Sequence, residues 1–115
     1  MANHDPALDR LFQALADPTR RAVLERLTQG PATVGELAAP FAMALPSLIG
    51  HLRKLEAAGL IETRKDGRVR TCAVRPEALT PVQGWLDVQR AQWEARLDRL
   101  DSYVAKLMKE RANGA

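Results

Sequence analysis

Four side chains near the middle of the sequence have types and spacing suited to hydrogen bonding with nucleic acid. At relative positions 0, 3, 4 and 7 stand Ser47, Gly50, His51 and Lys54. An α-helix places such positions on one face, because it turns by about 100° per residue. A face with small, hydroxyl, imidazole and ammonium groups can enter a DNA major groove and contact base edges and phosphates. An ordinary solvated helix face is the alternative, and this helix alone leaves both open.

A charged β-hairpin is predicted directly after this helix. The segment ETRKDGRVR, residues 62–70, contains Asp66-Gly67, a dipeptide typical of two-residue hairpin turns. Its four cations are Arg64, Lys65, Arg68 and Arg70. Beside a basic helix, such a hairpin can lie along the phosphate backbone or at the minor groove. A hairpin whose charges only protect a sheet edge from aggregation is the alternative, and the neighbouring basic helix makes it much less favoured.

Helix and hairpin together predict a surface that binds double-stranded DNA. Base readout is expected from Ser47, His51 and Lys54, and phosphate binding from the arginines and Lys65. The candidate DNA-binding residues are Leu45, Pro46, Ser47, Gly50, His51, Arg53, Lys54, Arg64, Lys65, Arg68 and Arg70.

Three helices are predicted ahead of this surface. The first covers about residues 6–16 and has one apolar face. The second begins at Pro18, after Asp17 as its N-cap residue. The third, TVGELAAPF, is short and begins with a T-x-x-E capping box. A tight connection over residues 42–44 then leads to the fourth helix, which gives the geometry of a helix-turn-helix.

The fourth helix is predicted over about residues 45–58, with Gly59 in a left-handed conformation after its end. Its core-facing side chains are expected to be Leu45, Leu48, Leu52 and Leu55. The strands LIETRK and RVRTCAV follow, and RPEALTP connects them to the last helix.

The last helix is predicted from Thr80, where Thr80 and Gln83 form a T-x-x-Q capping box, to about Lys109. Its apolar residues form a heptad seam interrupted only by Arg90. A helix this long exceeds what a small domain covers, so we expect a homodimer interface shared with the first helix. A monomer whose last helix folds back is the alternative. The candidate interface residues are Leu8, Leu11, Phe12, Trp85, Leu86, Trp93, Leu97, Leu100, Val104 and Leu107.

The segment from Asp17 to Val74 resembles the ArsR family of winged helix-turn-helix bacterial repressors. The matching phrases are DPTRRAVLERL and ELAAPFAMALPSLIGHLRKLEAAGLIETRKDGRVRTC. The resemblance implies a mainly α-helical fold with a β-hairpin wing, in the order α-α-α-α-β-β-α, that dimerises through its first and last helices. Members often cap the reading helix with Ser or Thr and carry Ser and a cation before His-Leu. This chain has Ala44 at the cap position and Ile49-Gly50 before His-Leu. It therefore lacks the polar and the basic side chain that would make two DNA contacts at Ile49 and Gly50. Three explanations of Ile49-Gly50 are open. The mildly favoured one is that Ile49 packs at the edge of the core while Gly50 allows DNA to approach closely. The alternatives are that Ile49 contacts thymine methyl groups, or that DNA binding is weakened.

Metal-sensing members of that family use cysteine pairs in the third helix, or Asp, His and Glu on the last helix. Neither pattern is present, so we expect no metal and no cofactor. The single cysteine, Cys72, is predicted to be a half-buried strand residue, and a redox switch is the alternative. No catalytic motif is evident, so we do not expect an enzyme.

The chain has 115 residues and a formal net charge of +3, which suits one domain whose charge placement matters more than its sum. Within it we expect a dimerisation helix over 1–16, a winged helix-turn-helix core over 17–75 and a second dimerisation helix over 80–110. No secretory signal or membrane span is visible, so a cytoplasmic location is expected.

The predicted function is sequence-specific transcriptional regulation, as a dimeric repressor that binds an inverted-repeat operator. A protein-interaction module with weakened DNA binding is the main alternative. A regulator that responds to a small molecule near Trp85 and Trp93, or to redox, is a weaker one, and the effector is unknown.

Overall fold

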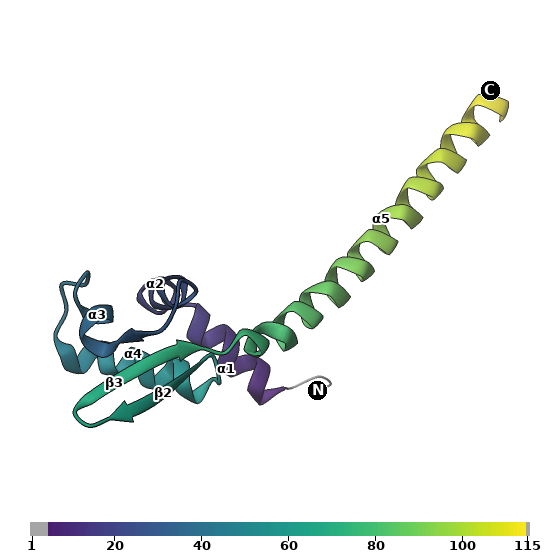
Figure 1. Ribbon diagram of the computed structural model, residues 1–115. Helices are drawn as coiled ribbons and strands as arrows, with labels where there is room; N and C mark the ends of the chain where they lie inside the picture. Colours follow the sequence, from purple (N-terminus) through teal and green to yellow (C-terminus); the bar gives the residue numbers. More distant parts are fainter. Residues whose placement is uncertain (1–4, 115) are drawn as a thin grey trace. The chain divides into compact units, whose positions relative to one another are not determined.

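The computed structural model of the chain describes residues 5–114, so the expectations for residues 1–4 lie outside it. The chain divides into two units, one ending at Val82 and the other beginning at Gln83 (Figure 1). The predicted order α-α-α-α-β-β-α is confirmed, with a short strand and a 3-10 helix added. The elements are α1 (Pro6–Leu15), α2 (Pro18–Leu27), β1 (Ala32–Thr33), α3 (Val34–Ala38), α4 (Leu45–Ala57), β2 (Ile61–Asp66), β3 (Val69–Val74), η1 (Pro76–Leu79) and α5 (Thr80–Gly114).

The starts of α2 and α3 follow the predicted capping chemistry. A carboxylate oxygen of Asp17 accepts a hydrogen bond from the backbone N–H of Arg20 at 3.0 Å, which caps α2. The capping box of α3 is complete: the Thr33 hydroxyl accepts from the Glu36 N–H, and the Glu36 carboxylate accepts from the Thr33 N–H. Gly59 has a φ of 77°, as expected for a residue that ends a helix in the left-handed region.

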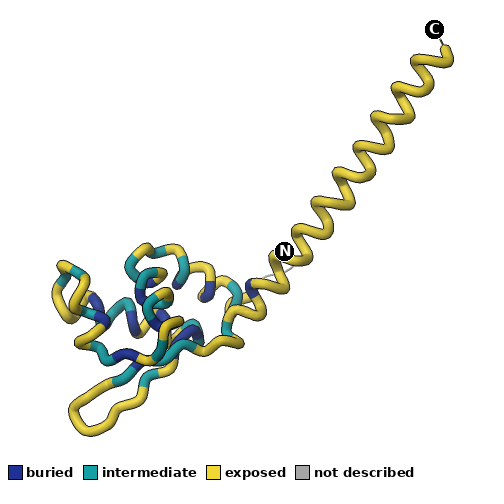
Figure 2. The backbone as a smooth tube through the Cα atoms, turned by 45° about the horizontal axis from the view of Figure 1, so that its top comes forward, coloured by how far each residue is buried: buried dark blue, intermediate teal, exposed yellow. Residues whose placement is uncertain are grey.

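The winged-helix unit surrounds one hydrophobic core. Buried residues of α1, α2, α3 and α4 and of the strands β1, β2 and β3 form it, together with Leu60 and Val82 (Figure 2). The buried residues are Leu11, Ala14, Val23, Leu27, Ala32, Leu37, Leu48, Leu52, Leu55, Leu60, Ile61, Cys72 and Val82.

Two leucines lie elsewhere than expected. Leu45 is 51% exposed, so its prediction as a core residue is wrong; it stands in the first turn of α4, beyond the edge of the core. Leu11 is only 3% exposed and belongs to the chain's own core. It therefore offers almost no surface to a second copy, whereas Leu8 is half-buried and Phe12 is exposed.

The sheet has three antiparallel strands in the order β1-β3-β2. β1 was not predicted, and it pairs Ala32 with Cys72 and Thr33 with Thr71. The hairpin is confirmed, but its turn is displaced by one residue. Asp66 pairs with Val69 inside the ladder, so the loop is Gly67-Arg68 rather than Asp66-Gly67. Gly67, with a φ of 64°, supplies the left-handed conformation that a tight hairpin turn requires.

The start of the last helix also differs from the sequence prediction. The Thr80 N–H donates to the Glu77 carbonyl within η1, so it is not available for a capping box. The Gln83 side chain instead donates to the Asp87 carboxylate at 2.8 Å. α5 continues to Gly114, beyond the predicted end at Lys109.

The unit from Gln83 onward consists of α5 alone, and residues 83–114 are all exposed (Figure 2). Across residues 5–114, no helix combines the length and apolar character that crossing a membrane demands.

Candidate nucleic-acid interface

The outward face of α4 is placed largely as the sequence predicted. Leu48, Leu52 and Leu55 are buried, and Ser47, Arg53 and Lys54 are exposed, as is Pro46 in the first turn. Because the three leucines fix the rotation of the helix, the polar residues must face away from the core.

Gly50 lies on this face and is half-buried. A Cβ added there meets no heavy atom within 4 Å, so packing within the described chain does not require a glycine. Ile49, the other departure from the family phrase, is half-buried and lines a groove beside α4.

His51 points toward the start of α2 rather than outward with Ser47 and Lys54. Its Nδ1 lies 3.1 Å from an Arg20 guanidinium nitrogen and 3.7 Å from an Asp17 carboxylate oxygen. Since guanidinium can only donate, His51 Nδ1 acts as the acceptor in this hydrogen bond. Only the Nε2–H of His51 is then left to donate a hydrogen bond to DNA. His51 can therefore contact a base through one ring nitrogen, not through both.

Arg20 is a buried residue beside the candidate site that sequence reasoning missed. It is 8% exposed, and its guanidinium also donates to the carbonyls of Ala14 at 2.7 Å and Gln13 at 2.9 Å. These carbonyls lie at the C-terminal end of α1, where the Gln13 carbonyl also accepts from the Ala16 N–H at 3.3 Å. Arg20 thus joins the end of α1 to α2 and α4. The signal was its position three residues before Val23, on the apolar stripe of α2, where a charge must be paired.

Asp17 belongs to the same cluster and is held in its charged form. The backbone N–H of Arg20 lowers the pKa of the Asp17 carboxyl most; burial opposes this, and the charge of Arg20 and the backbone N–H of Thr19 lower the pKa further. The N-cap of α2 is therefore a carboxylate at neutral pH.

The two faces of the wing, residues 61–74, carry different side chains. Cross-strand partners share a face, so Lys65 and Arg70 lie on the same side as Thr63 and Cys72. That side faces α4, because the Thr63 hydroxyl donates to the Glu56 carboxylate at 2.7 Å. Arg64 pairs with Thr71 and lies on the opposite face. The structure therefore separates Arg64 from the other candidate phosphate-binding residues.

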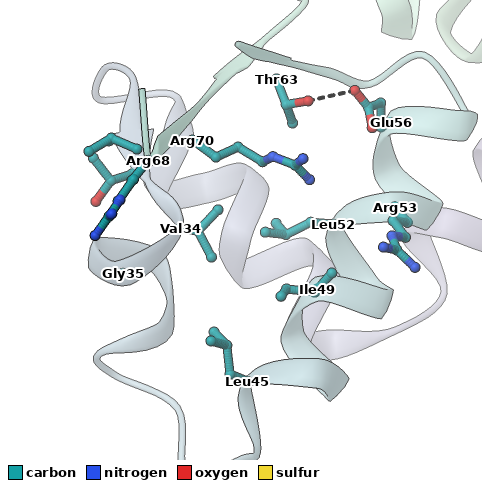
Figure 3. A pocket seen from close by; sticks show the side chains of 12 residues that line it. Val34, Gly35, Leu45, Ile49, Leu52, Arg53, Glu56, Thr63, Arg68 and Arg70 are labelled. Atoms are coloured by element: carbon teal, nitrogen blue, oxygen red, sulfur yellow. Dashed lines mark hydrogen bonds between the residues drawn. The ribbon is translucent and has the colours of Figure 1, made fainter. Parts of the chain in front are cut away.

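A groove of about 620 Å³ lies between α4, the start of α3 and the wing. Val34, Leu45, Ile49 and Leu52 converge on it, and the Arg70 side chain extends from β3 across it (Figure 3). Three cations line it: Arg53 from α4, Arg68 from the turn and Arg70 from β3. Its one acidic residue, Glu56, already accepts the Thr63 hydrogen bond. The groove therefore combines apolar walls with a net positive charge, which suits a polyanion whose backbone runs between helix and wing.

The structure also bears on the expectations for Cys72 and for a metal site. Cys72 is completely buried rather than half-buried, and burial, with a contribution from Glu56, raises the pKa of its thiol despite the opposing charge of Arg70. A buried thiol with a raised pKa is a poor nucleophile, which disfavours the redox alternative. Within residues 5–114, no three His, Cys, Asp or Glu side chains gather closely enough to hold a metal ion.

The chain is similar in sequence to known helix-turn-helix transcriptional regulators. A helix-turn-helix domain family matches residues 15–64. HTH-type transcriptional regulator Rv2034 of Mycobacterium tuberculosis is 43% identical over 69% of this chain and 74% of its own length. Transcriptional repressor SdpR of Bacillus subtilis is 30% identical over 69% of this chain and 88% of its own.

The structural comparison points the same way. The crystal structure of an ArsR family transcriptional regulator superposes with a TM-score of 0.74 and 60% sequence identity, over 76% of this chain and 97% of that one. A second ArsR-like regulator, from Rhodococcus, superposes with a TM-score of 0.71 at 29% identity, over 82% of this chain and 89% of that one. With its helix-turn-helix, charged wing and these relatives, the chain belongs to the ArsR family of winged helix-turn-helix transcriptional regulators.

Proposed function

We propose that this regulator is a cytoplasmic, homodimeric repressor that binds an inverted-repeat operator and blocks promoter access, without enzymatic activity. The 30% identical relative from Bacillus subtilis is named a transcriptional repressor, which supports repression rather than activation. The observation that carries the proposal is the groove in which Arg53, Arg68 and Arg70 line the space between α4 and the wing.

In the proposed complex, α4 enters the major groove and the wing follows the phosphate backbone. Ser47 and Lys54, exposed on α4, contact base edges. Arg53, Lys65, Arg68 and Arg70 bind phosphates, because their guanidinium and ammonium groups lie on α4 or along the side of the wing nearest to it. Pro46 and Gly50 let the backbone of α4 approach the DNA closely, and Leu45 and Ile49 offer apolar contacts to thymine methyl groups.

The dimer is proposed to form through the apolar residues of α5, together with Leu8 and Phe12 of α1. Trp85, Leu86, Trp93, Leu97, Leu100, Val104 and Leu107 are all exposed in the single chain. Exposed apolar surface of this extent marks an interaction site. A twofold dimer would set two copies of α4 about 34 Å apart, one turn of B-DNA.

The proposal is tested by changing the spacing of the half-sites. The probe is a DNA fragment from the protein's own upstream region that contains an inverted repeat and shifts in a gel. Inserting five base pairs between the half-sites rotates one by about half a turn relative to the other. We expect this insertion to abolish tight binding, while the same insertion outside the repeat leaves it unchanged.

Equal binding to both fragments would contradict a dimer that reads two half-sites. Absence of any salt-dependent shift on upstream DNA would contradict DNA binding itself. That second result would favour the alternative in which the winged helix has become a protein-interaction module.

A further inference from the structure

A second, smaller pocket borders α4 where α1 packs beside it. It has a volume of about 180 Å³ and lies between the end of α1 and the last turns of α4. Three cations line it, each from a different helix: Arg10 from α1, Arg20 from α2 and Lys54 from α4. Within the described part of the chain, no acidic residue lines it. The pocket is therefore positively charged, although the sequence predicted nothing for Arg10.

This pocket and the groove beside the wing flank the outward face of α4 on opposite sides. At 3.6 residues per turn, Lys54 in the pocket lies about 160° around the helix from Glu56, which lines the groove. The exposed Ser47 and the half-buried Gly50 lie on the face between the two. A ligand that covers this face therefore has cations of the protein on both of its sides.

DNA is such a ligand, because the major groove has two charged walls. An α-helix with its side chains is about 10–12 Å across, and the major groove of B-DNA is about 12 Å wide. A helix that enters the groove therefore comes close to both walls, which are the phosphate backbones of the two strands. The wing can reach only the wall on its own side of α4. The other wall lies on the side of α4 where Arg10 is found.

The Arg10 side chain is available for such a contact. Arg10 and Lys54 are both exposed, and across residues 5–114 neither side chain forms an ion pair. Arg10 is two positions from Leu8 and from Phe12, so it lies about 160° around α1 from each of them. A second copy that packs on Leu8 and Phe12 would leave Arg10 accessible.

Arg20 holds the α1 side of the pocket in place. Its guanidinium donates to the carbonyls of Ala14 and Gln13 at the end of α1 and to His51 Nδ1 on α4. These bonds fix the end of α1 against α4, so Arg10 has a defined position beside the reading face. They also cover carbonyl oxygens at the negative end of the α1 dipole, which would otherwise repel a phosphate.

We propose that Arg10 is a DNA-binding residue that contacts a phosphate on the strand opposite the one bound by the wing, next to the base pair that Lys54 contacts. α1 and the wing then hold α4 between the two walls of the major groove. This inference rests on the proposed DNA-binding function and adds to it a contact from α1. Phosphate contacts of this kind set the register of a protein on the duplex without reading sequence.

The dependence of DNA binding on salt tests the contact. Arg10→Ala should reduce the slope of log Kd against log salt by about 1.8 per dimer, because two phosphate contacts are lost. Affinity should fall alike for the operator and for a scrambled duplex, as expected for a contact that carries no sequence information. Arg10→Lys keeps the charge and should keep most of the slope. Fluorescence anisotropy of the full-length protein across a salt series measures all three effects.

Two controls separate the contact from a general effect. Arg64→Ala removes the same charge from the face of the wing turned away from α4, and it should leave the slope near the wild-type value. Arg10 is exposed, and arginine and alanine both favour helices, so Arg10→Ala should unfold thermally as the wild type does. Equal slopes in Arg10→Ala and wild type would overturn the inference. Equal reductions in Arg10→Ala and Arg64→Ala would also overturn it.

Neutral phosphates show which strand Arg10 contacts. Duplexes that carry one methylphosphonate each, placed in turn along both strands of a half-site, lose one phosphate charge at a known position. At the phosphate bound by Arg10, this change should weaken binding of the wild type but bring no further loss in Arg10→Ala. The corresponding position for Arg70→Ala should lie on the other strand of the same half-site. Positions for both variants on one strand would contradict contact with the two walls.

The two proposals fail in different ways. A wild-type protein that binds upstream DNA with the same salt slope as Arg10→Ala remains a DNA-binding regulator and loses only the contact from α1. A wild-type protein that gives no salt-dependent shift on that DNA removes both proposals.

Discussion

Gly50 lies on the outer face of α4, and packing within the described chain does not require a glycine there. It lies inside α4, where glycine costs about 1 kcal/mol relative to alanine, and a Cβ added to it meets nothing within 4 Å. The space beside it is therefore available to DNA. A small residue here permits close approach of the α4 backbone to the duplex.

Substitution of Gly50 should separate stability from binding. Gly50→Ala should raise the free energy of unfolding by about 1 kcal/mol, because the helix gains propensity without a clash. Gly50→Lys should steepen the dependence of log Kd on log salt by about 1.8 per dimer, since two new phosphate contacts form. Urea melts and fluorescence anisotropy across a salt series measure the two effects. An unchanged salt slope in Gly50→Lys would place Gly50 off the DNA face.

Asp17 gives the winged-helix unit a defined response to acid. Its pKa is lowered in the folded state, chiefly by the Arg20 N–H, so its stabilising contribution is present above the unfolded pKa. That contribution is lost as pH falls below about 4 through the folded value. Asp17→Asn keeps an N-cap acceptor but does not titrate. We expect denaturant melts from pH 6 to pH 2.5 to show a smaller acid-induced loss of stability in Asp17→Asn, and equal losses would contradict this role.

At the scale of elements, α4 begins without a side-chain cap. Ala44 has the extended conformation of an N-cap residue, but its methyl group accepts no hydrogen bond. Ala44→Ser should therefore stabilise the protein by about 1 kcal/mol in urea melts. Ala57→Ser, in the exposed last turn of the same helix, is the matched control and should bring no gain. Equal effects of the two substitutions would show that capping is not the cause.

The elements that sequence reasoning predicted well are those with local signals. The caps at Asp17 and Thr33 and the left-handed Gly59 depend on neighbours in sequence, so their patterns were sufficient. β1 was missed because two residues acquire strand geometry only by pairing with β3. The Asp66-Gly67 dipeptide indicated a hairpin but not its register, which the pairing of both strands fixes.

In the candidate site too, features with local sequence signals were predicted, and features set by tertiary packing were not. The exposure of Ser47 and Lys54 followed from the leucine repeat of α4. The hydrogen bond between Arg20 and His51 joins residues 31 positions apart, and the position of Arg64 on the far face depends on strand register. Neither could be derived from spacing alone, because both depend on tertiary packing.

At the scale of the whole molecule, DNA affinity should depend on the seam of α5, which lies outside the winged-helix unit. Leu97→Lys combined with Leu100→Lys places charge at adjacent a and d positions, so the variant should be monomeric by light scattering. A monomer engages one half-site, and its affinity for the inverted repeat should fall at least tenfold, on the order of the gain from bivalent binding. Undiminished affinity in a monomeric variant would contradict cooperative binding of two half-sites.

The most direct measurement compares the two faces of the wing. Arg70 lines the groove beside α4 and Arg64 lies on the opposite face of the same hairpin. Arg70→Ala should reduce the slope of log Kd against log salt by about 1.8 per dimer, since two phosphate contacts are lost. Arg64→Ala, the matched control, should leave the slope near the wild-type value. A wild-type slope in Arg70→Ala, or an equal reduction in both variants, would contradict a DNA backbone that runs between α4 and the wing.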